Sequence, residues 1–229
     1  MSSLTDFSKD IAFDKTEGIN IVKVGLPIAM QDTLINISFI ILTVIANLRG
    51  LVASSAVGVV EKLIMFMFLI PSSMLSAISA FTAQNMGANK KDRAVSALKF
   101  GMLITALFGA VMCAISWICP QSLTSIFSKD EAVIIAANEY LKSYSIDCIL
   151  VAFTFCVNGY LCGCEKSFVT FIHNTISIFL VRIPMAYIFS KAFADTMLPM
   201  GLASPLGSLA SIIILCIYFA IQKRKKQLN

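Results

Sequence analysis

Six long apolar stretches cover most of this chain, and four of them carry charged residues away from their ends. The stretches are residues 24–48, 56–83, 97–119, 134–161, 167–190 and 200–222. A helix needs about 20 predominantly apolar residues to cross a hydrocarbon core of about 30 Å, and every stretch reaches that length. The sequence therefore predicts an all-α integral membrane protein with six transmembrane helices.

The composition leaves little room for a soluble fold. Hydrophobic residues make up 58% of the 229 residues, charged residues make up only 14%, and the mean hydropathy is +0.84. A soluble domain of this length cannot bury that share of apolar side chains. We therefore expect the lipid bilayer to be a partner of the chain.

The net charge of +5 does not point to a nucleic-acid partner, because its densest run directly follows the last stretch. Residues 223–229 hold that run and are expected to form a basic cytoplasmic tail in contact with anionic lipids. With six spans, twelve Lys and Arg residues fall on the side of the termini and four on the opposite side. Because basic residues concentrate in cytoplasmic loops, we expect a multi-pass protein of the plasma membrane with both termini in the cytoplasm.

Residues 1–23 precede the first stretch. Residues 1–16 have no sustained apolar core, so no signal peptide is expected there. Between residues 10 and 23, apolar and charged residues interleave, which predicts an amphipathic arm lying along the cytoplasmic face of the membrane. A flexible linker is the alternative, because Gly18 interrupts a short pattern.

The sequence lacks the usual motifs of enzymatic chemistry. It has no G-x-x-x-x-G-K-[ST] loop and no H-E-x-x-H, and His173 is its only histidine. The C-x-C formed by Cys162 and Cys164 is short of the ligands that zinc takes. We expect no enzyme, no metal site and no cofactor. His173 is predicted to hydrogen-bond between helices rather than to relay protons.

Polar residues inside the stretches are candidates for function, because a charge at the centre of a bilayer costs about 2.5–3.5 kcal/mol on insertion scales. Asp32 lies in the first stretch, next to Gln31 and one helical turn before Asn36. Asp32 and Asn36 share a helical face. We expect that face to point toward the interior of the bundle.

Five charged residues are expected in the outer half of the membrane, namely Glu61, Lys62, Lys142, Asp147 and Arg182. The helical rise places Glu61 and Arg182 at compatible depths, so an interhelical charge cluster is predicted. Two interpretations stay open. The cluster either locks helices together as structural ion pairs, or it forms an ion or substrate site.

Prolines mark candidate hinges. Pro27, Pro71 and Pro184 lie inside the stretches, where each removes a backbone donor and bends its helix. Carriers use such breaks as hinges, although proline is also frequent in ordinary membrane helices.

Four motifs resemble the second half of the multidrug and toxic compound extrusion (MATE) antiporters. Residues 25–31 (GLPIAMQ) resemble the start of the family's seventh span. Residues 83–88 (AQNMGA), followed by KDR at 91–93, resemble its loop after the eighth span. Residues 159–163 (GYLCG) resemble the end of the tenth span, and residues 181–187 (VRIPMAY) resemble the eleventh.

The resemblance implies one six-helix lobe of a two-lobe carrier that exports cationic amphiphilic compounds in exchange for Na⁺ or H⁺. Residues 1–23 then correspond to a cytoplasmic linker arm and residues 24–222 to the lobe. A substrate path between lobes needs a partner, which is either a first-half lobe or a second copy of this chain. Candidates for the substrate or ion pathway are Gln31, Asp32, Asn36, Glu61, Asp147, Asn158, Arg182 and Tyr187.

The chain departs from the family where ion coupling is concerned. Members with a cation site in this half carry acids in the seventh and tenth spans, near the positions of Ile35 and Val151 in this chain. Asp32 and Asp147 lie about one turn away. Three hypotheses follow: half of an antiporter, an autonomous homodimeric carrier, and a membrane scaffold or degenerate fragment that transports nothing.

Overall fold

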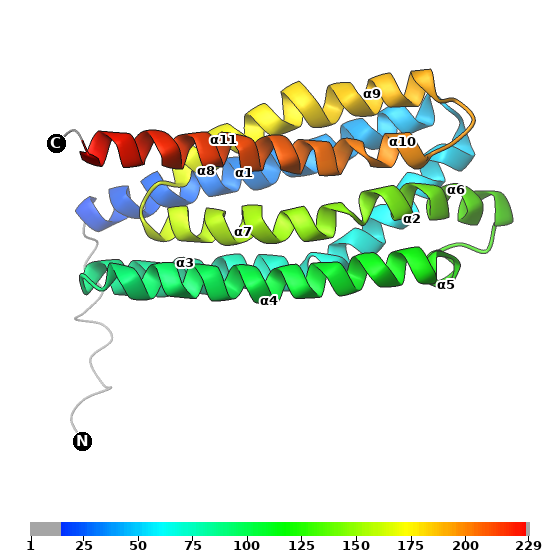
Figure 1. Cartoon of the computed structure of the whole chain (residues 1–229). Coiled ribbons are helices and arrows are strands. Elements are labelled where there is room, and N and C mark those ends of the chain that lie inside the picture. Colours follow the sequence, from blue (N-terminus) through cyan, green and yellow to red (C-terminus); the bar gives the residue numbers. More distant parts are fainter. Residues whose placement is uncertain (1–14, 228–229) are drawn as a thin grey trace, which may run out of the picture.

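The computed structural model describes residues 15–227, which form helices joined by short connections (Figure 1). No strand occurs among these described residues. The elements are α1 (Lys15–Asn47), α2 (Leu51–Met67), α3 (Leu69–Gly87), α4 (Lys91–Ile118), α5 (Pro120–Thr124), α6 (Glu131–Tyr144), α7 (Asp147–Gly163), α8 (Ser167–Ser177), the π-helix η1 (Ile178–Arg182), α9 (Ile183–Ala192), α10 (Leu198–Gly201) and α11 (Ala203–Gln227).

Four helical runs are long and apolar enough to cross a membrane, at residues 21–47, 91–118, 167–192 and 198–224. Two further candidates are bent pairs. α2 and α3 meet at an angle of 41°, and α6 and α7 meet at 48°. Counting each pair as one span gives up to six spans in the described residues. The predicted all-α membrane fold class is therefore confirmed.

The described part of the predicted arm, residues 15–23, lies on one helix with the first predicted span. α1 runs without a break from Lys15 past Pro27 to Asn47. The boundary that the sequence places at residues 23 and 24 has no turn or bend in the structure. Residues 1–14 of the predicted arm and residues 228–229 of the predicted tail lie outside the described residues.

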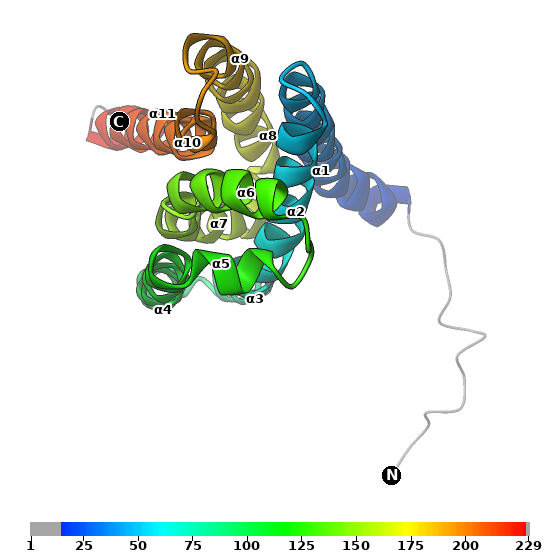
Figure 2. The same cartoon turned by 90° about the vertical axis from the view of Figure 1, so that its right-hand side faces the viewer.

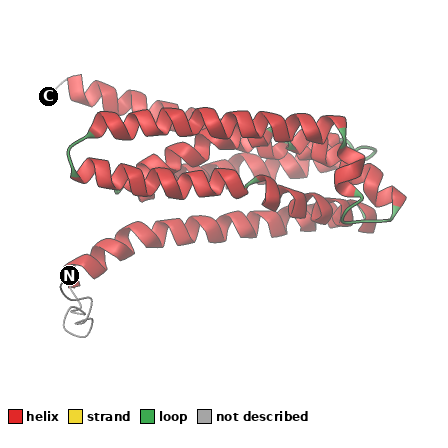
Figure 3. Cartoon of the chain, turned by 90° about the horizontal axis from the view of Figure 1, so that it is seen from below, coloured by secondary structure: helices red, strands yellow, loops and turns green. Residues whose placement is uncertain are grey.

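The helices lie side by side along one long axis, with their connections at the two ends of the bundle (Figures 1 and 3). α1 begins and α11 ends at the same end, which also holds the α3–α4 and α7–α8 turns (Figure 1). We call this the basic end, because Lys90, Lys91, Lys166, Lys223 and Arg224 lie there. Seen along the axis, α6 and α7 occupy the middle of the bundle (Figure 2).

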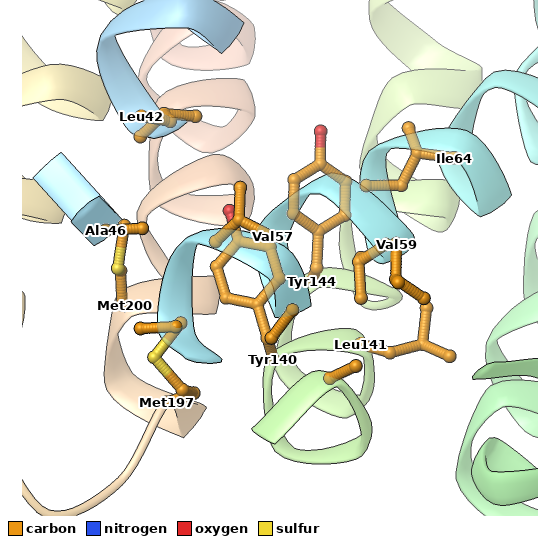
Figure 4. Packing of buried hydrophobic residues seen from close by; sticks show 14 of the residues in the cluster. Leu42, Ala46, Val57, Val59, Ile64, Tyr140, Leu141, Tyr144, Met197 and Met200 are labelled. Carbon is orange, nitrogen blue, oxygen red and sulfur yellow. The ribbon is translucent and has the colours of Figure 1, made fainter. Parts of the chain in front are cut away.

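The main hydrophobic core lies toward the end opposite the basic end, where α2, α6 and α10 meet α1 (Figure 4). Tyr140 and Tyr144 of α6 are almost fully buried there, with ring centroids 5.9 Å apart. A smaller cluster of Ile78, Ala94 and Cys156 joins α3, α4 and α7. α7 contributes to both clusters, through Cys148 in the first and Cys156 in the second.

The loop between α9 and α10 is tied to the bundle by two charged side chains. Arg49 donates through Nη2 to the carbonyl oxygens of Ala194 at 2.5 Å and Thr196 at 3.0 Å. Glu139 of α6 accepts from Thr196 Oγ1 and from the backbone N–H of Met197, both at 2.7 Å. These bonds fix the end of α9 and the start of α10 relative to α1 and α6.

Glycines let α7 pack closely against α3 and α4. A Cβ atom built on Gly109 of α4 would collide with the backbone carbonyl of Cys148, and one built on Gly159 of α7 would lie 2.5 Å from the carbonyl oxygen of Leu75 in α3. Small residues allow this close backbone approach, which is a common way for membrane helices to associate. α7 is therefore held by backbone contact on two sides.

We predict that Gly109→Ala lowers the free energy of unfolding by about 1–3 kcal/mol, because its new methyl group meets fixed backbone atoms. Gly58→Ala is the control. Gly58 also lies inside a helix, but a Cβ there meets nothing within 4 Å. Thermal unfolding in detergent, followed by circular dichroism, measures both. Equal midpoints for the two variants would contradict the close packing of α4 on α7.

Candidate functional site

A polar cavity of about 100 Å³ lies inside the lobe. Its walls come from α1, α6, α7, α8, η1, α11 and the break between α2 and α3. Ile35 and Val151, which the resemblance to the MATE family places near its acidic positions, are part of this wall. The charged lining residues are instead Asp147 and Arg182.

Arg182 enters the cavity from an irregular piece of helix. It is the last residue of the π-helix η1, and Pro184 follows at the start of α9. Its guanidinium carbon lies 4.6 Å from the centroid of the Phe39 ring on α1, a cation–π contact. Its Nη2 atom donates to Tyr144 Oη at 3.2 Å. Its Nε atom is buried and has no hydrogen-bond partner among the described residues.

Asp147 enters the cavity from the bent span formed by α6 and α7. It is the first residue of α7, directly after the bend at residues 145–146. Its side chain is buried, and Ser208 of α11 lies beside its carboxylate. Arg182 is close enough to attract it electrostatically. Asp147 Oδ1 has no hydrogen-bond partner in the described part of the chain.

Unpartnered polar atoms concentrate around this cavity. Besides Asp147 Oδ1 and Arg182 Nε, the buried atoms Asn174 Nδ2 and Ser204 Oγ line it and lack hydrogen-bond partners among residues 15–227. Leaving such an atom unsatisfied costs about 1–3 kcal/mol. Polar cavities of this kind are normally filled by water or by a ligand that satisfies their walls. The cavity is therefore built to hold something polar.

Glu61 faces a second, more open space. A groove of about 330 Å³ between α1 and α2 is lined by Asn36, Phe39, Thr43 and Glu61, together with apolar side chains. Thr43 Oγ1 donates to Glu61 Oε1 at 3.2 Å, and Arg182 attracts the Glu61 carboxylate. Phe39 lines both the groove and the cavity, so its ring forms a shared wall.

The structure brings three of the five predicted cluster members together. Glu61, Asp147 and Arg182 interact electrostatically around the two spaces. Lys62 is exposed instead, with its ammonium 5.9 Å from the centroid of the Phe127 ring. Lys142 is half-buried on α6 and lines neither the cavity nor the groove.

The expected inward direction of Asp32 and Asn36 is wrong. Both side chains are exposed, and Asn36 Nδ2 donates to the backbone oxygen of Asp32 at 2.9 Å. The buried face of α1 instead contains Gln31, Ser38 and Leu42. One residue of helix turns the side chain by about 100°, so Gln31 is buried while its neighbour Asp32 is not. Asn36 still lines the groove.

The two remaining site candidates lie elsewhere. Asn158 is buried and its Oδ1 atom lies 2.8 Å from His173 Nε2, while His173 Nδ1 lies 2.6 Å from Ser211 Oγ. His173 therefore bonds between α7, α8 and α11. Tyr187 is exposed, and it lies toward the end of the bundle opposite the basic end. The Lys191 ammonium lies 4.6 Å from the centroid of the Tyr187 ring.

The candidate hinge prolines differ in their surroundings. Pro71 is buried in the first turn of α3, just after the 41° bend. Pro184 is the second residue of α9, two positions after the end of the π-helix. Pro27 lies inside the unbroken helix α1. Two of the three prolines thus adjoin irregular backbone near the cavity.

Several lining residues were not singled out from the sequence. On α11, Ser204, Gly207, Ser208 and Ser211 form a stripe of small residues at helical spacing, and all four line the cavity. Their i, i+3, i+4, i+7 pattern was the available signal. The small side chains leave room for the cavity; Ser177 Oγ also donates to the Gly207 carbonyl oxygen.

Known proteins similar to this chain are named for resistance and extrusion. The probable multidrug resistance protein YoeA of Bacillus subtilis is 21% identical over 96% of this chain and 47% of its own length. The multidrug and toxin extrusion protein 1 of Homo sapiens is 25% identical over 76% of this chain and 29% of its own length.

Solved structures show the same fold. A crystal structure of MATE in the straight conformation matches with a TM-score of 0.86 at 16% identity, over 95% of this chain and 49% of that one. A crystal structure of MATE in complex with MaL6 matches with a TM-score of 0.85 at 16% identity, over 95% and 50%. The chain thus spans about half the length of these transporters, and half or less of the relatives above.

The family assignment rests on a match across most of the helices. The MatE family model matches residues 27–188, from Pro27 in α1 to Ile188 in α9. This region is more than half of the 229 residues and includes the cavity residues Asp147 and Arg182. The chain therefore belongs to the MatE family.

Proposed function

We propose that this chain is the second six-helix half of a cation-coupled multidrug efflux antiporter, which exports cationic amphiphilic compounds in exchange for Na⁺ or H⁺. The names of the relatives support a transporter rather than an enzyme. The motifs resembling the seventh to eleventh spans support the second half. The observation that carries the proposal is the polar cavity with its unpartnered Asp147 oxygen.

The cavity offers oxygen atoms that can bind a proton or a hard monovalent cation. The carboxylate of Asp147 and the hydroxyls of Ser204 and Ser208 supply the oxygen ligands that such ions prefer. The guanidinium of Arg182 opposes a second positive charge, because like charges repel at short range. Asp147 therefore has two cationic partners in this mechanism, and gaining the ion weakens its attraction to Arg182.

The groove suits the substrate class. Phe39, Ile40, Val44 and Met65 offer an apolar and aromatic surface, and Glu61 offers a negative charge. Aromatic rings and carboxylates together attract organic cations. Phe39 contacts Arg182 and lines the groove. A change in the interactions of Arg182 would therefore shift the Phe39 ring and alter the shape of the groove. This contact is the proposed route of coupling.

The groove has one wall in this chain, formed by α1 and α2. We propose that a first-half MATE lobe supplies the other wall. The polar and charged groups of the groove, Asn36 and Glu61, would otherwise face lipid, where a charge is costly. A second copy of this chain is the alternative occupant.

We predict that cells expressing this chain extrude ethidium only when a first-half MATE lobe from the same source is co-expressed. The chain alone should leave the dye at the level of cells with empty vector, because the groove lacks its second wall. Efflux by the chain alone would instead support a homodimeric carrier. Absence of efflux in both arms, with both halves in the membrane, would support a scaffold that transports nothing.

A second prediction separates a functional charge pair from a structural one. Asp147→Asn should lower stability by about 1–3 kcal/mol, because it removes the buried carboxylate that attracts the half-buried Arg182 guanidinium. The double variant Asp147→Asn/Arg182→Gln should recover most of that stability. If the pair carries coupling, both variants should lose ethidium efflux by at least about tenfold.

Lys62→Gln is the matched control for these variants. It removes a charge from α2 next to Glu61, but its side chain is exposed and lines neither space. Efflux should stay within about twofold of the unmodified two-lobe complex. A double variant that regains both stability and efflux would show that Asp147 and Arg182 only hold helices together.

A further inference from the structure

A third pocket lies at the basic end, away from the cavity and the groove. Its volume is about 360 Å³, and three lysines from separate parts of the chain line it: Lys91 at the start of α4, Lys166 before α8, and Lys223 near the end of α11. No carboxylate is part of its lining. Three separate elements therefore bring positive charge to one concave surface.

The pocket also offers neutral hydrogen-bonding groups. Tyr160, Tyr218 and Gln222 line it, and Gln222 Nε2 donates to Tyr218 Oη at 3.3 Å. Lys91 is the first residue of α4, and Lys166 directly precedes α8. Both helices begin without a side-chain cap. Their first N–H groups add partial positive charge at the same end. The combination suits a group with several anionic oxygens, such as a phosphate.

One edge of the pocket is apolar. Met86, Leu161 and Phe219 line it beside the lysines. Phe219 and Cys216 precede Lys223 by four and seven residues on α11, so the three share a helical face. Phe219 and Cys216 are both exposed on the surface of the helix bundle. An apolar strip thus runs from the pocket along α11, away from the basic end.

We propose that this pocket binds the phosphate headgroup of an anionic lipid, with an acyl chain lying along the Phe219 and Cys216 face of α11. The basic residue distribution predicts that this end lies in the cytoplasm, where the leaflet carries anionic lipids. A free phosphate would use the lysines but not the apolar strip. The lipid therefore accounts for both parts of the surface. This inference does not depend on the proposed transport function.

The test is native mass spectrometry of the full purified chain in detergent. The chain is titrated in separate arms with dioleoylphosphatidylglycerol, dioleoylphosphatidylcholine and inorganic phosphate. We expect the phosphatidylglycerol complex to have a Kd at least about tenfold lower than the phosphatidylcholine complex. The variant Lys91→Gln/Lys166→Gln/Lys223→Gln should lose that preference, because it removes the three charges that line the pocket.

The charge-matched control is Lys15→Gln/Arg93→Gln/Lys99→Gln, which removes three exposed charges that do not line the pocket. It should keep the preference. The three single variants of the pocket are measured as well, so that misfolding of the triple variant, seen by circular dichroism, leaves the test intact. Equal loss in the control, no lipid preference in the unmodified chain, or displacement of the lipid by millimolar inorganic phosphate would each overturn the proposal.

Discussion

Polar groups inside a bilayer have no water to bind, and this constraint accounts for where the helices of this lobe are irregular. A break in a membrane helix frees backbone donors and acceptors, which are tolerated only where protein or a water-filled cavity surrounds them. The bend between α2 and α3 at Phe68, the bend before Asp147 and the π-helix ending at Arg182 all adjoin the polar cavity. The breaks therefore share one site with Asp147 and Arg182.

The two charged residues of the cavity are held in different ways. Asp147 begins α7, whose neighbours α3 and α4 approach it at Gly159 and Gly109 with backbone in contact. Arg182 lies on a π-turn followed by Pro184, so its backbone lacks the regular α-helical bonding. Asp147 thus begins a helix that is closely packed on two sides. Arg182 lies where its span departs from regular α-helical hydrogen bonding.

Hydropathy predicted the membrane fold well because each span can be recognised from its length and apolar composition. Helical rise predicted a cluster of Glu61, Lys62, Lys142, Asp147 and Arg182 and matched the depths of Glu61 and Arg182; the structure keeps Lys62 and Lys142 out of it. The direction of Asp32 was wrong because depth does not specify the face that a helix buries; the packing of Gln31, Ser38 and Leu42 decides it. The bend at residues 145–146 gave no signal, because neither residue is glycine or proline.

The cavity itself lay beyond prediction because no local segment builds it. Its polar wall combines Asn174 of α8 with Ser204 of α11, while its apolar wall includes Phe39 of α1. The serine stripe of α11 was visible in the sequence, but small residues also mark ordinary helix packing. Only the burial of unpartnered atoms distinguishes the two uses.

The sequence suggested that the charges form one wall of a space whose opposite wall is missing. The structure places these charges in two different spaces. Asp147 and Arg182 line a cavity among α1, α6, α7, α8, η1, α11 and the α2–α3 break, whereas Glu61 lines a groove between α1 and α2. Since the Phe39 ring borders both spaces and contacts the Arg182 guanidinium, a displacement of Arg182 in the cavity would reach the groove through this one aromatic side chain.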